Sequence, residues 1–193
     1  MTGTLSHDTR PLVTLDEQTH VYTHRDGHRP PGVTSILNAN EPWKSRFARA
    51  DPNRLAYKGD LGRQAHRATQ YFDEGTLDWT SVDPVLVPYI EAWVLFRREK
   101  RFEPLQMEQA VYHPVYGYAG TLDRIGIADD TPTLIDIKSG DGSIAGPQTA
   151  GYLEAWSAMQ HADRPGHALA FMPRWSVQLL PTGKYAITEH KSR

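Results

Sequence analysis

The fold of this chain follows from two short segments, GTLD at residues 120–123 and LIDIK at residues 134–138. In a strand, successive side chains point to opposite faces, so Asp136 and Lys138 share one face while the two isoleucines point to the other, toward a core. Charged groups at the end of so apolar a strand cost free energy unless they are paired or bind a metal ion. With Asp123 on the preceding segment, the pattern indicates a metal site, and a purely structural ion pair is the alternative.

Length and composition bound the class of protein. With 193 residues and 39% hydrophobic content, the chain can bury one core, so we expect a flexible leader at residues 1–11 and a single domain at residues 12–193. The absence of cysteine excludes disulfides, thiolate zinc sites and cysteine-ligated iron–sulfur clusters. No apolar run approaches a membrane span, and the start lacks a signal pattern. We therefore expect a soluble cytoplasmic protein with no membrane partner.

The basic residues are clustered, although the net charge of −2 does not indicate a nucleic-acid-binding protein. One cluster runs from Lys44 to Arg67 and contains only two acidic residues, and a second occupies residues 97–101. Solvated helix faces are one interpretation of such clusters. Beside an acidic metal site, a groove that follows the phosphates of a nucleic acid is the interpretation we favour.

Apolar periodicity and turn residues predict the helices and strands. We place the start of the helix that carries His66 at Asp60, as its N-cap, and its end at Gly75. Pro88 leaves the start of the next helix open between positions 83 and 88. The elements expected before residue 102 are strands at 12–15 and 20–23 within an N-terminal hairpin flap (12–31), and helices at 33–37, 60–75 and 83–101.

The second half of the chain predicts a sheet that carries the acids. Its strand candidates are separated by turns rich in Pro, Gly and Asp, and one helix interrupts them. The fold class is therefore α/β, with a central mixed β-sheet flanked by helices. The expected elements are strands at 105–113, 117–127 and 133–138, a helix at 146–160, and strands at 168–172, 175–180 and 184–188.

Five polar elements follow one another in a fixed order along these helices and strands. They are His66 after Gly62, Glu108, GxxD at 120–123, DxK at 136–138 and QxxxY at 148–152. DxK alone is common by chance, but the five in this order are specific. Together they resemble the PD-(D/E)XK nuclease superfamily, in its RecB-like and phage-exonuclease branch, over residues 32–159. HVY at 20–22 and GVTSIL at 32–37 also resemble the lead-in of phage members.

Two positions depart from the pattern of that superfamily. The first acidic motif is Leu122-Asp123 rather than Pro-Asp, and the second acid is Asp136 where many relatives carry Glu. Neither change removes a carboxylate, so neither indicates an inactive protein. The subtype with iron–sulfur cysteines is excluded, because the chain has no cysteine.

The resemblance implies a restriction-endonuclease-like core that binds Mg²⁺ or Mn²⁺, and a histidine ligand favours Mn²⁺. Lys138 would orient or activate the attacking water, while Gln148 and Tyr152 would steady the DNA strand or the lysine. The implied residues are His66, Asp123, Asp136 and the Ile137 carbonyl for the metal; Asp123, Asp136, Lys138 and Glu108 for catalysis; and Gln148, Tyr152, Arg63, Arg67 and Arg124 for substrate binding.

Several of these residues also have an ordinary structural interpretation. His66 alone fits a surface or core histidine, and Glu108 fits a charge at a strand edge. Tyr152 fits a buried residue of an amphipathic helix whose hydroxyl is satisfied internally.

The function that the resemblance implies is a metal-dependent DNA exonuclease in phage-type or bacterial recombination or repair. It would hydrolyse phosphodiesters by in-line attack of a metal-activated water. A structure-selective endonuclease on the same site, and a catalytically idle DNA-binding or protein-interaction module on the same fold, are the alternatives. The expected partner is DNA, single or double stranded, in a bacterial or phage-infected cell. A recombination partner protein and a homo-oligomer fit the same class.

Overall fold

The computed structural model describes residues 11–40, 51–140, 142–160 and 172–191. The leader expected at 1–11, except Pro11, and the strand expected at 168–172, except Met172, lie outside these residues. The described elements, in chain order, are β1 (Val13–Asp16), β2 (Val21–His24), α1 (Val33–Ala39), α2 (Pro52–Asp73), the short 3₁₀ helix η1 (Trp79–Ser81), α3 (Val87–Glu99), β3 (Glu103–His113), β4 (Tyr118–Ala128), β5 (Thr131–Lys138), α4 (Ala145–Gln160), β6 (Arg174–Leu179) and β7 (Tyr185–His190).

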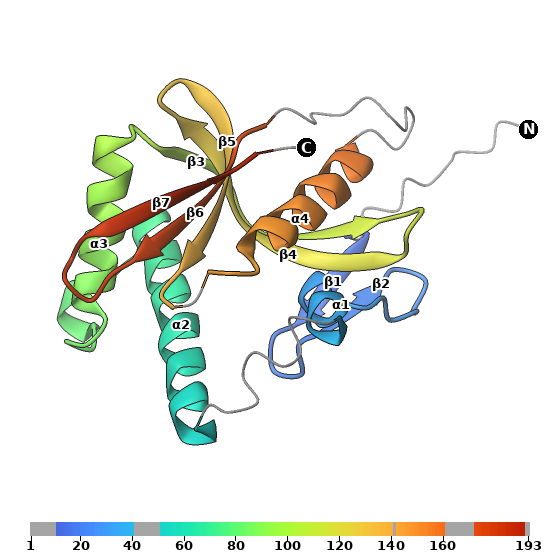
Figure 1. The fold of residues 1–193 in the computed structure, drawn as a ribbon, viewed down its shortest axis with the longest axis horizontal. Helices are drawn as coiled ribbons and strands as arrows, with labels where there is room; N and C mark the ends of the chain where they lie inside the picture. The colour runs from blue at the N-terminus through green and yellow to red at the C-terminus, as the bar shows by residue number, and fades with distance from the viewer. Residues whose placement is uncertain (1–10, 41–50, 141, 161–171, 192–193) are drawn as a thin grey trace, which may run out of the picture.

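A five-stranded mixed sheet lies at the centre of the fold, in the order β3-β4-β5-β6-β7 (Figure 1). The pair β5–β6 is parallel, and the other three pairs are antiparallel. Two parallel neighbours need a crossover connection, and α4 supplies it between β5 and β6. The expected α/β fold with a central mixed sheet and helices is confirmed.

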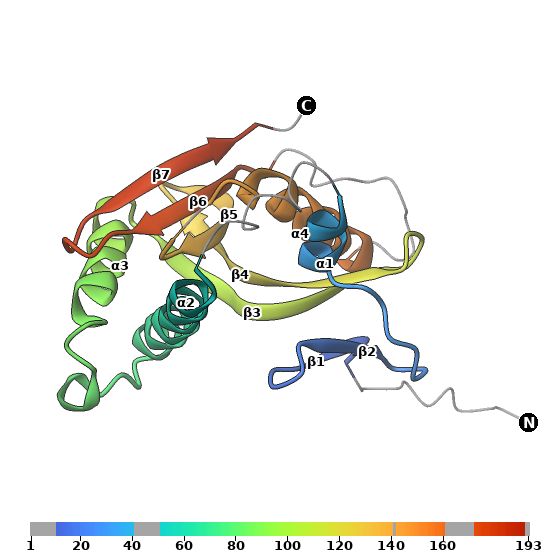
Figure 2. The same cartoon turned by 60° about the horizontal axis from the view of Figure 1, so that its bottom comes forward.

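Helices cover the two faces of this sheet (Figure 2). On one face, α2 and α3 bury a core in which Trp93 packs with Ile135 and Ile137. On the other face, Leu134 and Trp156 belong to a second core that α1 and α4 complete. The expected burial of the two isoleucines of β5 is thus confirmed. Of the helices in the described part of the chain, none combines the length and apolar character that a membrane span requires.

The N-terminal hairpin forms its own two-stranded sheet, β1–β2, beside the ends of β3 and β4. Val13 and Tyr22 pack against Tyr112 and Ala119 in a small third core. The hydroxyl of Tyr22 lies 3.1 Å from that of Thr121, two residues before Asp123. The hairpin is confirmed, and its contacts place it next to the strand that carries the first acid.

Helix α2 begins earlier than the sequence analysis predicted. Its N-cap is Asp51, whose carboxylate accepts from the N–H of Asn53 at 2.9 Å, and Pro52 opens the first turn. Asp60, the expected N-cap, instead lies inside the helix and pairs with Arg63. The expected start was wrong because the Asp-Pro signal at 51–52 lies within the basic cluster and was not recognised as a cap.

Gly126 is required by the close approach of β3. A Cβ atom at this position would overlap the carbonyl oxygen of Glu103 and the ring of Phe102. We predict that Gly126→Ala lowers the free energy of unfolding by about 2 kcal/mol, because the Glu103 backbone and the Phe102 ring must move to make room for the methyl group. Gly140→Ala is the control: a Cβ atom there would meet open space, so the free energy of unfolding should stay unchanged. Urea denaturation of the two variants checks this, and equal losses would contradict it.

Candidate metal centre

The ladder between β4 and β5 ends at the pair Arg124–Ile135, at the point where the acids begin. Beyond it, the N–H of Ile137 donates to the Asp123 carboxylate at 2.6 Å. The carbonyl of the same residue accepts from Nε2 of His66 at 2.7 Å. On this side of β5, the side chains of Asp123 and His66 therefore form the hydrogen bonds of the Ile137 N–H and carbonyl. They bring an acid from β4 and a histidine from α2 to one place.

His66, Glu108 and Asp123 together form a group that could hold a cation. One ligand atom of each lies within 4.8 Å of the others. Because Nε2 of His66 must carry a proton to bond the Ile137 carbonyl, the lone pair of Nδ1 is left, and Nδ1 lies 3.7 Å from Asp123. Two carboxylates and one imidazole are a donor set that suits Mn²⁺ or Mg²⁺. The residues thus fit the expected metal.

Glu108 reaches this group from an irregular position in β3. Its backbone is left-handed, with φ of 47°, which a residue with a Cβ adopts only when its surroundings hold it there. Burial, together with the charge of Asp123, raises the pKa of its carboxyl, while His66 and Arg124 oppose the shift. Sequence alone left Glu108 close to an ordinary strand-edge charge, and the structure places it beside His66 and Asp123.

Asp136 and Lys138 form a buried ion pair, with Nζ 2.8 Å from Oδ1. The pKa of Asp136 is raised to about 6, because burial and the charge of Asp123 raise it more than the charge of Lys138 lowers it. For Lys138, burial alone would lower the pKa, but Asp136 and Asp123 raise it above its usual value, so the side chain stays an ammonium. The shared face of the two residues is confirmed. In this structure Asp136 contacts the lysine, and its contact with a metal stays a prediction.

Gln148 and Tyr152 of α4 hold the lysine from the other side. Lys138 donates to Oε1 of Gln148 at 3.1 Å, and Nε2 of Gln148 donates to the Tyr152 hydroxyl at 2.7 Å. A Cβ atom at Gly120 would overlap the Tyr152 ring, which explains why a glycine precedes the acid by three residues. Gln148 therefore steadies the lysine. Tyr152 is buried and contacts Gln148, and its expected contact with substrate stays a prediction.

The assignment of Arg124 to substrate binding was wrong. Its side chain is fully buried and donates to Asp73 at 2.8 Å and to Glu108 at 2.7 Å. Asp73 also accepts from Trp93 and Arg97. A guanidinium enclosed in this way cannot reach a phosphate, so Arg124 instead neutralises the buried Asp73 and the half-buried Glu108, and it orients Glu108.

The structure describes only part of the first basic cluster. Lys44, Arg46 and Arg49 lie outside the described residues. Arg63 and Arg67 are exposed on α2, paired with Asp60 and Glu17, and their contact with DNA stays a prediction. Three basic residues of the 97–101 cluster form ion pairs: Arg97 with Asp73, Lys100 with Asp129, and Arg101 with Asp130. These pairs favour a locally neutralised surface over a phosphate groove at 97–101.

Two supporting residues were missed by sequence reasoning. Asp73 lies at the end of α2, and its partners are 20 to 51 positions away, so no local pattern marks it. Thr34 accepts from Gln148 at 3.2 Å, across 114 positions. Thr34 lies within GVTSIL at 32–37, the segment that resembles the lead-in of phage members, and nothing in that motif predicts its contact with Gln148.

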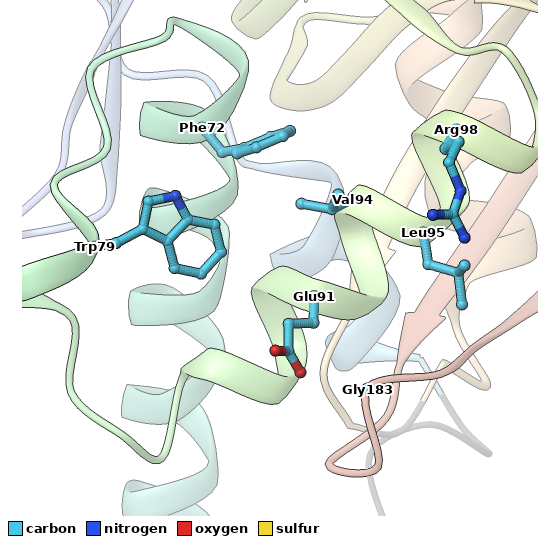
Figure 3. Close-up of a pocket in the computed structure, with 7 residues that line it drawn as sticks. All are labelled: Phe72, Trp79, Glu91, Val94, Leu95, Arg98 and Gly183. Carbon is cyan, nitrogen blue, oxygen red and sulfur yellow. The ribbon is translucent and has the colours of Figure 1, made fainter.

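An apolar hollow lies elsewhere in the molecule, beside α3 (Figure 3). The rings of Phe72 and Trp79 point toward Val94 across it, and Glu91, Leu95, Arg98 and Gly183 complete the lining. None of the expected site residues lines this hollow, so it is separate from the metal centre.

Two comparisons with known proteins found no match. No protein-family model matches the sequence, and no curated protein matches it. The function of this chain is therefore inferred from the order of its motif residues and from their contacts in the structure.

We predict that Arg124→Met lowers the free energy of unfolding by about 3 kcal/mol, because it leaves Asp73 and Glu108 without their buried counter-charge. Arg63→Met is the matched control, since the Arg63 side chain is 74% exposed and should contribute little. Chemical denaturation measures both. A stable Arg124→Met protein that had lost only affinity for DNA would restore the original assignment.

Proposed function

We propose that this chain is a metal-dependent deoxyribonuclease with a restriction-endonuclease-like core of the PD-(D/E)XK type. It acts as an exonuclease in phage-type or bacterial DNA recombination or repair, and it hydrolyses phosphodiester bonds with water. The observation that supports the proposal most is the convergence of His66, Glu108 and Asp123 next to the buried pair of Lys138 and Asp136. A structural ion pair alone needs neither the histidine nor the third carboxylate.

His66, Glu108 and Asp123 would hold the divalent ion, with Asp136 as a further carboxylate from β5. When bound, the ion supplies Lewis-acid stabilisation of phosphate charge and a nucleophilic water at neutral pH. Burial raises the pKa of both Glu108 and Asp136, and the negative charge of Asp123 raises it further, so a cation bound here would relieve the repulsion among these carboxylates.

Lys138 contributes a fixed positive charge. Its raised pKa keeps it protonated, so it donates hydrogen bonds and offsets negative charge on the phosphate rather than accepting a proton. Asp136 and Gln148 fix the ammonium from two sides, and the side chain remains 18% exposed. Lys138 is thus oriented before substrate arrives and still open to it.

Digestion of DNA tests the function directly. The substrates are end-labelled linear DNA and covalently closed circular DNA, each with Mg²⁺, Mn²⁺ or EDTA. Metal-dependent loss of the linear substrate alone establishes the exonuclease, and the label gives its polarity. Cutting of the circle assigns a structure-selective endonuclease on the same site. If neither is cleaved under any condition, the proposal fails and the idle DNA-binding or protein-interaction module replaces it.

We predict that Lys138→Ala lowers the turnover number by roughly 10²-fold or more, since one electrostatic contact to the transition state is typically worth about 3 kcal/mol. Binding of Mn²⁺ and of DNA should persist. Lys184→Ala, at an exposed lysine of the β6–β7 turn, is the control for loss of a positive charge. Single-turnover cleavage rates compare the two, and near-normal cleavage by Lys138→Ala would refute its role.

We further predict that Asp123→Asn abolishes most of the stabilisation by Mn²⁺. At an Mn²⁺ concentration of about 100 times its Kd, the wild-type protein should gain about 2.7 kcal/mol. The asparagine can still accept from the Ile137 N–H but lacks the ligand charge. Asp130→Asn is the control, because this exposed aspartate has a left-handed φ of 65° that asparagine tolerates. Thermal melts with and without Mn²⁺ measure this stabilisation. If Mn²⁺ raised the melting temperature of Asp123→Asn as much as that of the wild type, Asp123 would be excluded as a ligand.

A further inference from the structure

A second group of ligand-type side chains lies at the end of the hairpin, in the sequence HRDGH at residues 24–28. The turn closes on itself: the N–H of Gly27 donates to the His24 carbonyl at 2.8 Å, and the N–H of His24 donates to the His28 carbonyl at 2.9 Å. Gly27 has φ of 94°, which permits this tight reversal. The turn brings positions 24, 26 and 28 together.

The three side chains converge on one small volume. Oδ1 of Asp26 lies 2.9 Å from Nδ1 of His24 and 2.6 Å from Nδ1 of His28. One ligand atom of each residue lies within 4.8 Å of the other two. Two imidazole nitrogens and a carboxylate oxygen, all turned toward each other, are a set of donors that a single metal ion can bind at once.

Contacts with β3 hold the two rings in this orientation. The His24 side chain is only 14% exposed, and its ring packs 4.7 Å from the ring of Tyr112, centroid to centroid. Nε2 of His28 lies 3.4 Å from the Tyr112 hydroxyl. A partner on the outer ring nitrogen is the usual companion of a metal-binding histidine, because it fixes the ring and leaves the other nitrogen for the metal.

We propose that His24, Asp26 and His28 form a second metal site, separate from the group of His66, Glu108 and Asp123, and that it takes a transition-metal ion such as Zn²⁺. Two of the three donors are imidazole nitrogens, which suit Zn²⁺ and leave Mg²⁺ without its preferred oxygen ligands.

The site is structural in this proposal. Its ion ties the end of β2 to Tyr112 of β3, on the same hairpin whose Tyr22 contacts Thr121. It does not depend on the proposed nuclease activity, so either can fail without the other.

Titration of the full-length protein with Zn²⁺ tests the site by calorimetry. We expect the double variant His24→Gln/His28→Gln to bind one Zn²⁺ fewer than the wild type. Tyr112→Phe, which removes only the hydroxyl, should weaken the same binding event roughly tenfold. His20→Asn is the control, because His20 is an exposed histidine of the same hairpin with a left-handed φ of 56° that asparagine accepts. Equal stoichiometry and affinity in the wild type and the double variant would overturn the proposal.

A second measurement uses the wild-type protein alone, so it does not depend on folding of the variants. In ¹⁵N spectra of the histidine rings, one equivalent of Zn²⁺ should shift the Nδ1 resonances of two histidines, and a tenfold excess of Mg²⁺ should not reverse the shift. Perturbation of Nε2 resonances only, or reversal by Mg²⁺, would contradict the assignment.

Discussion

The two hydrogen bonds of Ile137 are the constraint on which the metal centre depends. In a strand, the N–H and carbonyl of one residue point the same way and normally exchange bonds with a neighbouring strand. Here the Asp123 carboxylate and the His66 ring take those places, because the β4–β5 ladder ends at Arg124–Ile135. The end of the β4–β5 ladder therefore aligns an acid and a histidine from different parts of the chain, and both backbone groups of Ile137 on that side keep a hydrogen-bond partner.

The charged residues around Ile137 are arranged so that most of the carboxylates have a positively charged partner. Glu108, Asp123 and Asp136 lie near one another, and such carboxylates are tolerated away from water only with compensating groups. Lys138 compensates Asp136, while Arg124 compensates Glu108 and links it to Asp73 beneath the sheet. The arrangement leaves Asp123 with a histidine and a backbone N–H as its partners. A divalent cation at this position would supply the charge that these neighbours do not.

Local patterns predicted most of the fold, and long-range pairs were beyond them. Alternation in LIDIK correctly placed Asp136 and Lys138 on one face, and turn residues bounded β3, β4 and β5 to within two residues of the observed ends. The start of α2 was missed although its Asp-Pro cap is visible. The role of Arg124 was missed because its partner Asp73 is 51 positions away, and a single sequence carries no sign of that pairing. The i, i+2, i+4 spacing of the ligand-type residues in HRDGH is visible in the sequence, but the sequence analysis did not identify it as a possible metal site.

The position of bound Mn²⁺ tests the central claim most directly. Anomalous diffraction from crystals grown in saturating Mn²⁺ locates the ion without reference to activity. The account predicts a peak coordinated by His66 through Nδ1 and by the carboxylates of Glu108 and Asp123. If no peak appears there at saturating Mn²⁺, or if Mn²⁺ is bound only by other residues, this description of the metal centre is wrong.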